Sequence, residues 1–152
     1  MTIDEICEKY EIENYTINPD GSIDVNDDVD LYNCNLTELP LTFNKVSGYF
    51  DCGRNKLTSL KGCPRWVGGF FYCTNNNLTS LEFSPDYVGG FFNCRYNKLT
   101  DNLCDTEIRG DFYTTLEQDG LIFDDNKATN YNEWRKLYKR KQTLNELYTR
   151  HM

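Results

Sequence analysis

Histidine is nearly missing from this sequence of 152 residues, since the only one is His151, next to the last residue. Histidine is the usual general base of Cys–His and Ser–His catalysis and the commonest metal ligand in proteins. The chain also lacks a GxGxxG or GxxxxGK motif, so it has no recognisable phosphate-binding loop. We therefore expect a protein that is not an enzyme, with no catalytic residue, no cofactor and no metal site.

Long apolar runs are also missing. No window approaches the roughly 18 apolar residues of a membrane-spanning helix, and the first residues, MTIDEICEKYEIE, do not resemble a signal peptide. The seven cysteines are an odd number, whereas a secreted disulfide framework normally pairs all of its cysteines. These features predict a cytoplasmic protein with reduced thiols and no membrane partner.

Positive charge is scarce over most of the chain. The net charge is −8, and residues 1–126 contain 9 Lys+Arg against 22 Asp+Glu, whereas residues 127–152 contain 7 against 2. Because phosphate binding needs concentrated positive charge, nucleic acid is not the expected partner of the acidic part. The basic C-terminal segment leaves nucleic acid open as an alternative.

The most prominent feature that is present is a repeat with a period of 21 residues. VGGFFYCTNNNLTSLEFSP at residues 67–85 is followed by VGGFFNCRYNKLT at residues 88–100. Five columns recur in register: Val46, Val67 and Val88; Phe50, Phe71 and Phe92; Cys52, Cys73 and Cys94; Asn55, Asn76 and Asn97; Leu57, Leu78 and Leu99. More degenerate copies lie on both sides, so residues 25–112 contain about five units. Such a period is typical of a solenoid of stacked units.

The pattern Phe-x-Cys-x-x-Asn-x-Leu-x-x-Leu resembles the core of leucine-rich repeats. The phrase VGGxFxCxxNxLTSLxGCP resembles the short bacterial and bacteriophage-encoded repeats of that family, which implies a parallel β-sheet on a concave face. The columns themselves predict a short strand that turns Phe and Cys inward, an Asn that bonds backbone groups of the turn, and a Leu that fills the interior. The cysteine column is therefore expected to be a buried structural stack.

The two ends of the solenoid need caps, because the last units would otherwise expose their apolar faces. Residues 1–24 are expected to form an N-terminal cap, with a helix that begins at Thr2 and a hairpin turn at residues 18–21. Residues 113–152 are expected to form a C-terminal cap with an amphipathic helix that begins after Asn130. Its apolar stripe is Tyr131, Trp134, Leu137, Tyr138, Leu144, Leu147 and Tyr148. The chain is thus predicted to be a single α+β domain, a capped leucine-rich repeat solenoid.

A candidate binding surface comes from the columns that vary between units. Strand alternation turns the residues before and after each buried Phe toward the same sheet face. An aromatic patch rimmed by charge is typical of a protein-binding surface. An alternative, in which a bulge turns Phe70 and Phe91 inward, stays open. The predicted partner-binding residues are Tyr49, Asp51, Arg54, Phe70, Tyr72, Phe91, Asn93, Arg95, Tyr96 and Tyr113.

The sequence therefore predicts a non-catalytic module that binds another protein through a concave aromatic face. The resemblance to bacteriophage-encoded repeats implies a host protein as the partner, an inhibitory action on host metabolism or defence, and the cytosol of a bacterial host as the compartment. The alternative function is nucleic-acid binding by the basic C-terminal helix. An exposed aromatic patch is also compatible with self-association.

Overall fold

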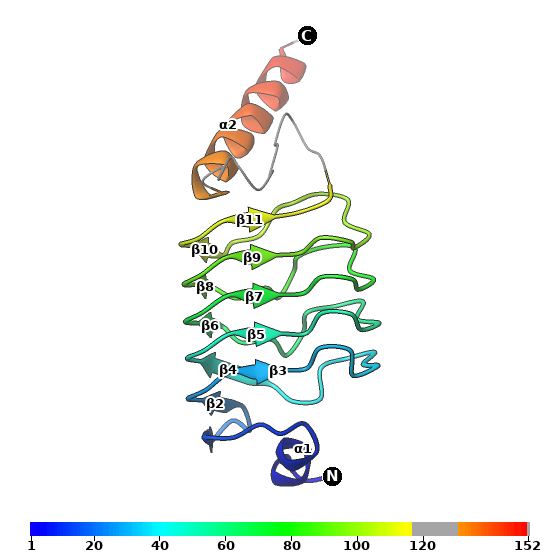
Figure 1. Ribbon diagram of the computed structural model, residues 1–152. Helices are drawn as coiled ribbons and strands as arrows, with labels where there is room; N and C mark the ends of the chain where they lie inside the picture. Colours follow the sequence, from blue (N-terminus) through cyan, green and yellow to red (C-terminus); the bar gives the residue numbers. More distant parts are fainter. Residues whose placement is uncertain (117–130, 152) are drawn as a thin grey trace.

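Two parallel β-sheets run along the length of the molecule (Figure 1). The computed structural model describes residues 1–116 and 131–151, apart from the side chains of Glu133 and Trp134. Within these residues each unit of the repeat forms one coil with two short strands, one in each sheet. The architecture is a parallel β-solenoid with a helix at each end, which agrees with the predicted capped α+β repeat solenoid.

Sheet A has the spatial order β1 (Tyr15–Ile17), β2 (Ile23–Val25), β4 (Phe43–Val46), β6 (Trp66–Val67), β8 (Tyr87–Val88) and β10 (Glu107–Ile108). Sheet B consists of β3 (Val29–Asp30), β5 (Phe50–Asp51), β7 (Phe71–Tyr72), β9 (Phe92–Asn93) and β11 (Phe112–Tyr113). Neighbouring strands are parallel, except that β1 and β2 form an antiparallel hairpin. Sheet B is the predicted sheet, whereas of sheet A only the β1–β2 hairpin was predicted.

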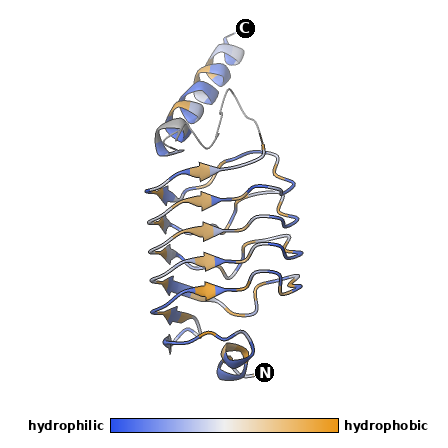
Figure 2. Cartoon of the chain, in the orientation of Figure 1, coloured by the Kyte–Doolittle hydropathy of each residue, from blue (hydrophilic) through white to orange (hydrophobic). Residues whose placement is uncertain are grey.

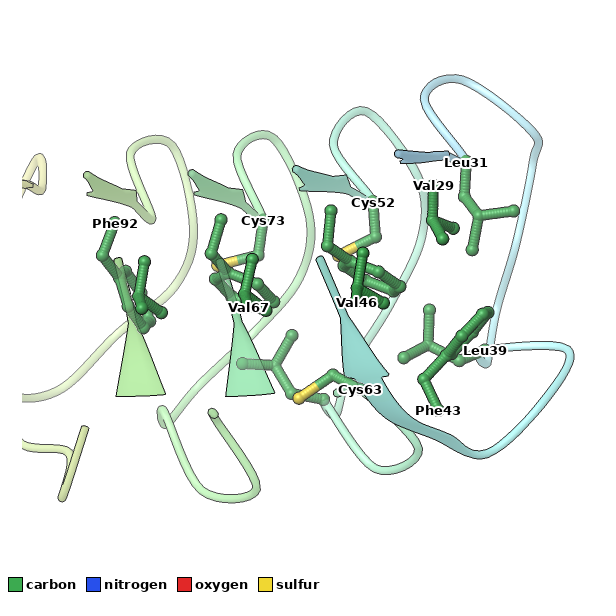
Figure 3. Packing of buried hydrophobic residues seen from close by; sticks show 14 of the residues in the cluster. Val29, Leu31, Leu39, Phe43, Val46, Cys52, Cys63, Val67, Cys73 and Phe92 are labelled. Carbon is green, nitrogen blue, oxygen red and sulfur yellow. The ribbon is translucent and has the colours of Figure 1, made fainter. Parts of the chain in front are cut away.

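The interior is filled by side chains that point toward each other from the two sheets (Figure 3). Because the period of 21 residues matches the register, like residues lie opposite each other in neighbouring coils. The ring centroids of Phe50 and Phe71 are 5.8 Å apart, and those of Phe71 and Phe92 are 5.0 Å apart. Hydrophobic residues therefore recur at one place in every coil (Figure 2). The fully buried columns include Val46, Val67, Val88, Phe50, Phe71, Phe92, Cys52, Cys73 and Cys94.

The asparagine column joins successive coils by hydrogen bonds. The side chain of Asn76 donates to the carbonyl oxygens of Cys52 (3.0 Å), Cys73 (3.3 Å) and Thr74 (3.2 Å), and it accepts from the N–H of Leu57 (3.0 Å). Equivalent bonds hold Asn55 and Asn97. The predicted role of this column in the turn is confirmed. Asn55, Asn76 and Asn97 are called the asparagine ladder below.

The corner between the two sheets is made of glycines because the coils touch there through their backbones. A Cβ on Gly89 would lie 2.2 Å from the carbonyl oxygen of Gly68, and a Cβ on Gly68 would lie 2.3 Å from that of Ser47. Real Cβ atoms do not approach a backbone oxygen so closely. The paired glycines therefore have a packing role at this corner.

The N-terminal cap follows the prediction. Helix α1 (Ile3–Lys9) begins after Thr2, whose hydroxyl accepts from the N–H of Glu5 at 3.2 Å, and it buries Cys7 against the first coil. The β1–β2 hairpin turns at residues 18–21, where the N–H of Gly21 donates to the carbonyl of Asn18 at 2.9 Å.

Helix α2 (Tyr131–Arg150) closes the other end with its first turns. Tyr131 is buried, its ring centroid lies 4.4 Å from that of Phe112, and its hydroxyl accepts from the N–H of Cys104 at 2.8 Å. Asn132 donates to the carbonyl of Ile108 at 3.0 Å. These contacts cover the last coil of the solenoid. The predicted helix start at Asn130 lies outside the described residues.

The apolar stripe predicted for this helix packs against the solenoid only in the first turns. Beyond its first turns α2 runs away from the end of the stack (Figure 1). Tyr138 still packs against the core, but Leu137, Leu144, Leu147 and Tyr148 have between 45% and 68% of their surface exposed.

Candidate functional site

The outer face of sheet B carries the predicted aromatic residues. Phe71 points into the core, so its neighbours Phe70 and Tyr72 lie on the opposite face, where their ring centroids are 4.7 Å apart. No bulge turns Phe70 or Phe91 inward. Both are half-buried by their neighbours on the outer face.

The rings on this face form one continuous stack across the coils. The centroids of Tyr49 and Phe70 are 4.8 Å apart with nearly parallel planes, and those of Phe70 and Phe91 are 5.0 Å apart. Tyr72 meets Phe91 edge-on at 5.2 Å, and Phe91 meets Tyr113 edge-on at 5.8 Å. The structure thus brings together Tyr49, Phe70, Tyr72, Phe91 and Tyr113, which are called the aromatic face below.

Charged side chains lie at both ends of the aromatic face. At the C-terminal end, the guanidinium of Arg95 lies 4.6 Å from the ring centroid of Tyr113, whose hydroxyl donates to Asp111 at 3.3 Å. At the other end, Tyr49 lies beside several carboxylates. Burial, followed by the charges of Asp30 and Asp28, raises the pKa of the Tyr49 phenol. Carboxylates therefore lie at both ends of the face, and the basic Arg95 lies at the C-terminal end.

Asp51 is the carboxylate on this face whose pKa is raised. Burial raises the pKa of Asp51, and the charge of Asp30 adds to the effect, although the N–H of Gly53 opposes it by donating to Asp51 at 2.8 Å. In the next coil but one, Asn93 occupies the same position and accepts from the N–H of Arg95 at 3.2 Å. An uncharged amide therefore accepts the same backbone hydrogen bond, from the N–H two residues later.

Asp51→Asn is expected to stabilise the protein at pH 7 by up to about 1 kcal/mol. Because the pKa of Asp51 is raised in the folded state, stability is lost as the pH rises from the ordinary pKa of aspartate through the folded value. The gain should vanish at a pH below about 3.9, where both states are protonated. Urea unfolding at neutral and acidic pH measures it, with Asp86→Asn, at an exposed position outside the aromatic face, as the control. A less stable variant at pH 7 would show that the contact with Gly53 needs the charge.

Arg54 and Tyr96 lie beside the aromatic face, in the turns that follow β5 and β9. Together with Asn33 and Asn75 they form a column of left-handed residues, with φ between 52° and 59°. Asparagine adopts this conformation readily, whereas a large side chain there is strained. Tyr96 is 62% exposed, so its ring is available at the rim of the face.

A second aromatic pair was missed by the sequence reasoning. The rings of Trp66 and Tyr87 stack on the outer face of sheet A with centroids 5.5 Å apart, and the ammonium of Lys45 lies 4.8 Å from the Trp66 ring centroid. Trp66 and Tyr87 each precede a residue of the valine column, so the repeat itself aligns them. The pair was not predicted because the valine column was not recognised as part of a strand.

The cysteine stack has no reactive environment. Cys52, Cys73 and Cys94 are fully buried, and burial raises the pKa of each thiol. Their predicted structural role is confirmed. Among residues 1–116 and 131–151, no three His, Cys, Asp or Glu side chains are grouped to hold a metal ion.

No family model, curated protein or solved structure matches this chain. In the part of the chain that the structure describes, no helix has the length and apolar character needed to cross a membrane.

Proposed function

We propose that the protein is a non-catalytic binding module that holds another protein through the aromatic face. The observation that carries this proposal is the continuous stack of Tyr49, Phe70 and Phe91 across three coils, with Tyr72 and Tyr113 between and beside them. Aromatic side chains supply much of the binding free energy of protein interfaces.

The scaffold suits this role because the rings are held in place before a partner arrives. Each ring is fixed by its neighbours in the adjacent coils, which are joined by sheet hydrogen bonds and by the asparagine ladder. A preorganised surface loses less conformational entropy on association. The charged side chains at the ends of the face, Asp28 and Asp30 beside Tyr49 and Arg95 beside Tyr113, supply orientation for the partner.

The resemblance of the repeats to bacteriophage-encoded leucine-rich repeats supports a narrower form of the proposal. In this form the partner is a protein of the bacterial host, the complex forms in the host cytosol, and binding inhibits host metabolism or defence.

The test is a pull-down from bacterial lysate with the wild type and two double variants. Phe70→Asp/Phe91→Asp alters the aromatic face, and Trp66→Asp/Tyr87→Asp makes the same kind of change in the aromatic pair of sheet A. We expect the first variant to bind the captured protein at least about 30-fold more weakly, since loss of central aromatic residues commonly weakens binding by about 2 kcal/mol or more. The second variant should bind as the wild type does.

Circular dichroism spectra establish that both variants are folded. A folded Phe70→Asp/Phe91→Asp variant that retains wild-type affinity would refute the proposal. Equal losses in both variants would show that the effect is not specific to the aromatic face.

A second candidate function is nucleic-acid binding by α2, which contains 6 Lys+Arg against 2 Glu. It requires that binding to random DNA or RNA weakens steeply with added salt. It leaves the exposed leucines of the same helix without a role.

A further inference from the structure

Within residues 1–116 and 131–151, two surfaces outside the aromatic face are uncovered. The first is the distal part of α2, where Leu137, Leu144, Leu147 and Tyr148 are exposed. On a helix, Leu137, Leu144 and Tyr148 fall on one side and Leu147 at its margin. Arg140 falls between Leu144 and Leu147, and Lys141 falls beside Tyr148, so basic side chains interrupt this stripe. The distal helix is therefore amphipathic, basic and without a covering surface in the described residues.

The second surface is a groove of about 560 Å³, formed by the segments that lead into the strands of sheet A. Four successive coils line it, through residues 42–43, 62–65, 80–86 and 101–105. Phe43, Leu81 and Leu103 supply apolar lining. Its charged lining consists of Glu82, Asp86, Asp101 and Asp105, together with the basic Arg65.

Phe83, which lines this groove, has a strained backbone conformation. It lies in the left-handed region with φ 67°, at the position where the preceding coil has Gly62 with φ 94°. A large side chain in that conformation is strained by roughly 1–2 kcal/mol. The Phe83 ring is nevertheless 54% exposed, so the fold itself gains little from it. Strained residues of this kind cluster at binding sites.

The groove and the distal helix match in charge and in length. Among the described residues, the groove lining has four carboxylates and one guanidinium, of which Asp86 pairs with Arg65 and Asp105 with Lys139 of the same chain, so Glu82 and Asp101 are the carboxylates offered to the distal helix. The distal helix is basic, with Arg140 and Lys141 against Glu146. From Leu137 to Tyr148 the helix rises about 16 Å. Four coils at the spacing of β-strands span about 14 Å. The groove is too small to enclose a whole helix of this length. The helix therefore lies over the groove and inserts only its leucine side chains.

We propose that the protein forms a dimer in which the distal part of α2 of each copy lies in the acidic groove of the other. The base of α2 already borders the groove of its own chain. Arg135 donates to the carbonyl of Cys104 at 2.8 Å, and Lys139 lies 3.5 Å from Asp105. Because helix and groove are adjacent at one end of the solenoid, a two-fold axis there brings each helix to the other groove. Leu144 and Leu147 then contact Phe83 and Leu103, which reach the surface of the groove.

The first measurement is the mass of the full chain in solution, by sedimentation velocity over a wide range of concentration and salt. We expect a dimer that dissociates on dilution and dissociates more readily in high salt, because the paired charges are screened. A monomer at all concentrations overturns the proposal. If that monomer binds random DNA or RNA through α2 with steep salt dependence, nucleic acid is the occupant instead.

The helix is tested with Leu144→Glu/Leu147→Glu, which we expect to weaken dimerisation at least 10-fold. Gln142→Glu/Thr149→Glu adds the same charge on the opposite side of α2 and serves as the matched control. It should weaken dimerisation clearly less. Equal losses would mean that only charge matters, which overturns the insertion of the leucines.

The groove is tested with Phe83→Gly, which separates folding from association. Glycine relieves the strained φ, so the monomer should become more resistant to urea while the dimer weakens several-fold. A dimer of unchanged affinity would place the contact elsewhere, as in a symmetric pairing of two α2 helices.

Finally, Leu144→Glu/Leu147→Glu and Glu82→Lys/Phe83→Gly chains are mixed. Each should be monomeric alone, but together they retain one intact helix–groove contact and should form a complex of two chains. Failure to associate overturns the exchange.

Discussion

Replacing Asn76 with alanine is expected to lower the free energy of unfolding by about 3–5 kcal/mol. Its buried side chain serves four backbone groups of two coils: it accepts from Leu57 and donates to Cys52, Cys73 and Thr74. Alanine leaves these groups without that partner in a region that excludes water. Each such loss costs about 1–3 kcal/mol, reduced where several groups share one donor. Urea unfolding followed by circular dichroism measures the change.

Two further variants make this test specific. Asn77→Ala alters the adjacent residue, whose backbone N–H donates to the carbonyl of Leu57, a bond that alanine keeps, so the loss should stay below about 0.5 kcal/mol. Asn76→Asp retains an acceptor for Leu57 but loses the donors, so it should be clearly less stable than the wild type. If Asn76→Ala and Asn77→Ala are equally stable, the asparagine ladder does not hold the coils together.

Replacing Gly89 with alanine is expected to cost about 3 kcal/mol or more. The added Cβ would lie 2.2 Å from the carbonyl oxygen of Gly68 and 3.1 Å from its carbonyl carbon. These are backbone atoms of the neighbouring coil, so no side-chain rotation relieves the clash. The coils must separate at this corner, which weakens the nearby pairing of β6 with β8 and β7 with β9.

The control for this steric prediction is Ser47→Ala. Ser47 occupies the same column two coils earlier and already has a Cβ, so removal of its hydroxyl should change stability by no more than about 0.5 kcal/mol. Thermal unfolding of both variants is the measurement. A Gly89→Ala protein as stable as Ser47→Ala would show that the corner can open without loss of sheet pairing.

The repeat was predictable because its period equals the length of one coil. Residues 21 positions apart then occupy the same place in neighbouring coils, so a column that stays apolar must be buried wherever it lies. This reasoning placed Phe71, Cys73 and Asn76 correctly. It also placed Phe70 and Tyr72 on the opposite face from Phe71, since alternation along a strand is local geometry.

Sheet A was not predictable in the same way. In the clear repeats its strands are as short as those of sheet B, but the valine of a strand such as Trp66–Val67 is followed directly by Gly68. No second inward residue gives the alternation that Phe71 and Cys73 give in sheet B, so the pattern does not distinguish a strand from a turn. These short strands form a sheet because neighbouring coils stack in register, and this stacking is a property of the tertiary structure. For the same reason the pair of Trp66 and Tyr87 was overlooked.

The repeated pattern specifies the coil: which side chains enter the core, which asparagines join the turns, and which aromatic residues line up on sheet B. All of these depend on neighbouring residues and neighbouring units, so one unit carries the information for the next. The arrangement of the ends does not follow from the repeat and is seen in the folded chain alone. The apolar stripe of α2 specifies a face of the helix but not what covers it, and that depends on the direction in which the helix leaves Tyr131. The groove near Phe83 likewise exists only because residues from four coils meet there.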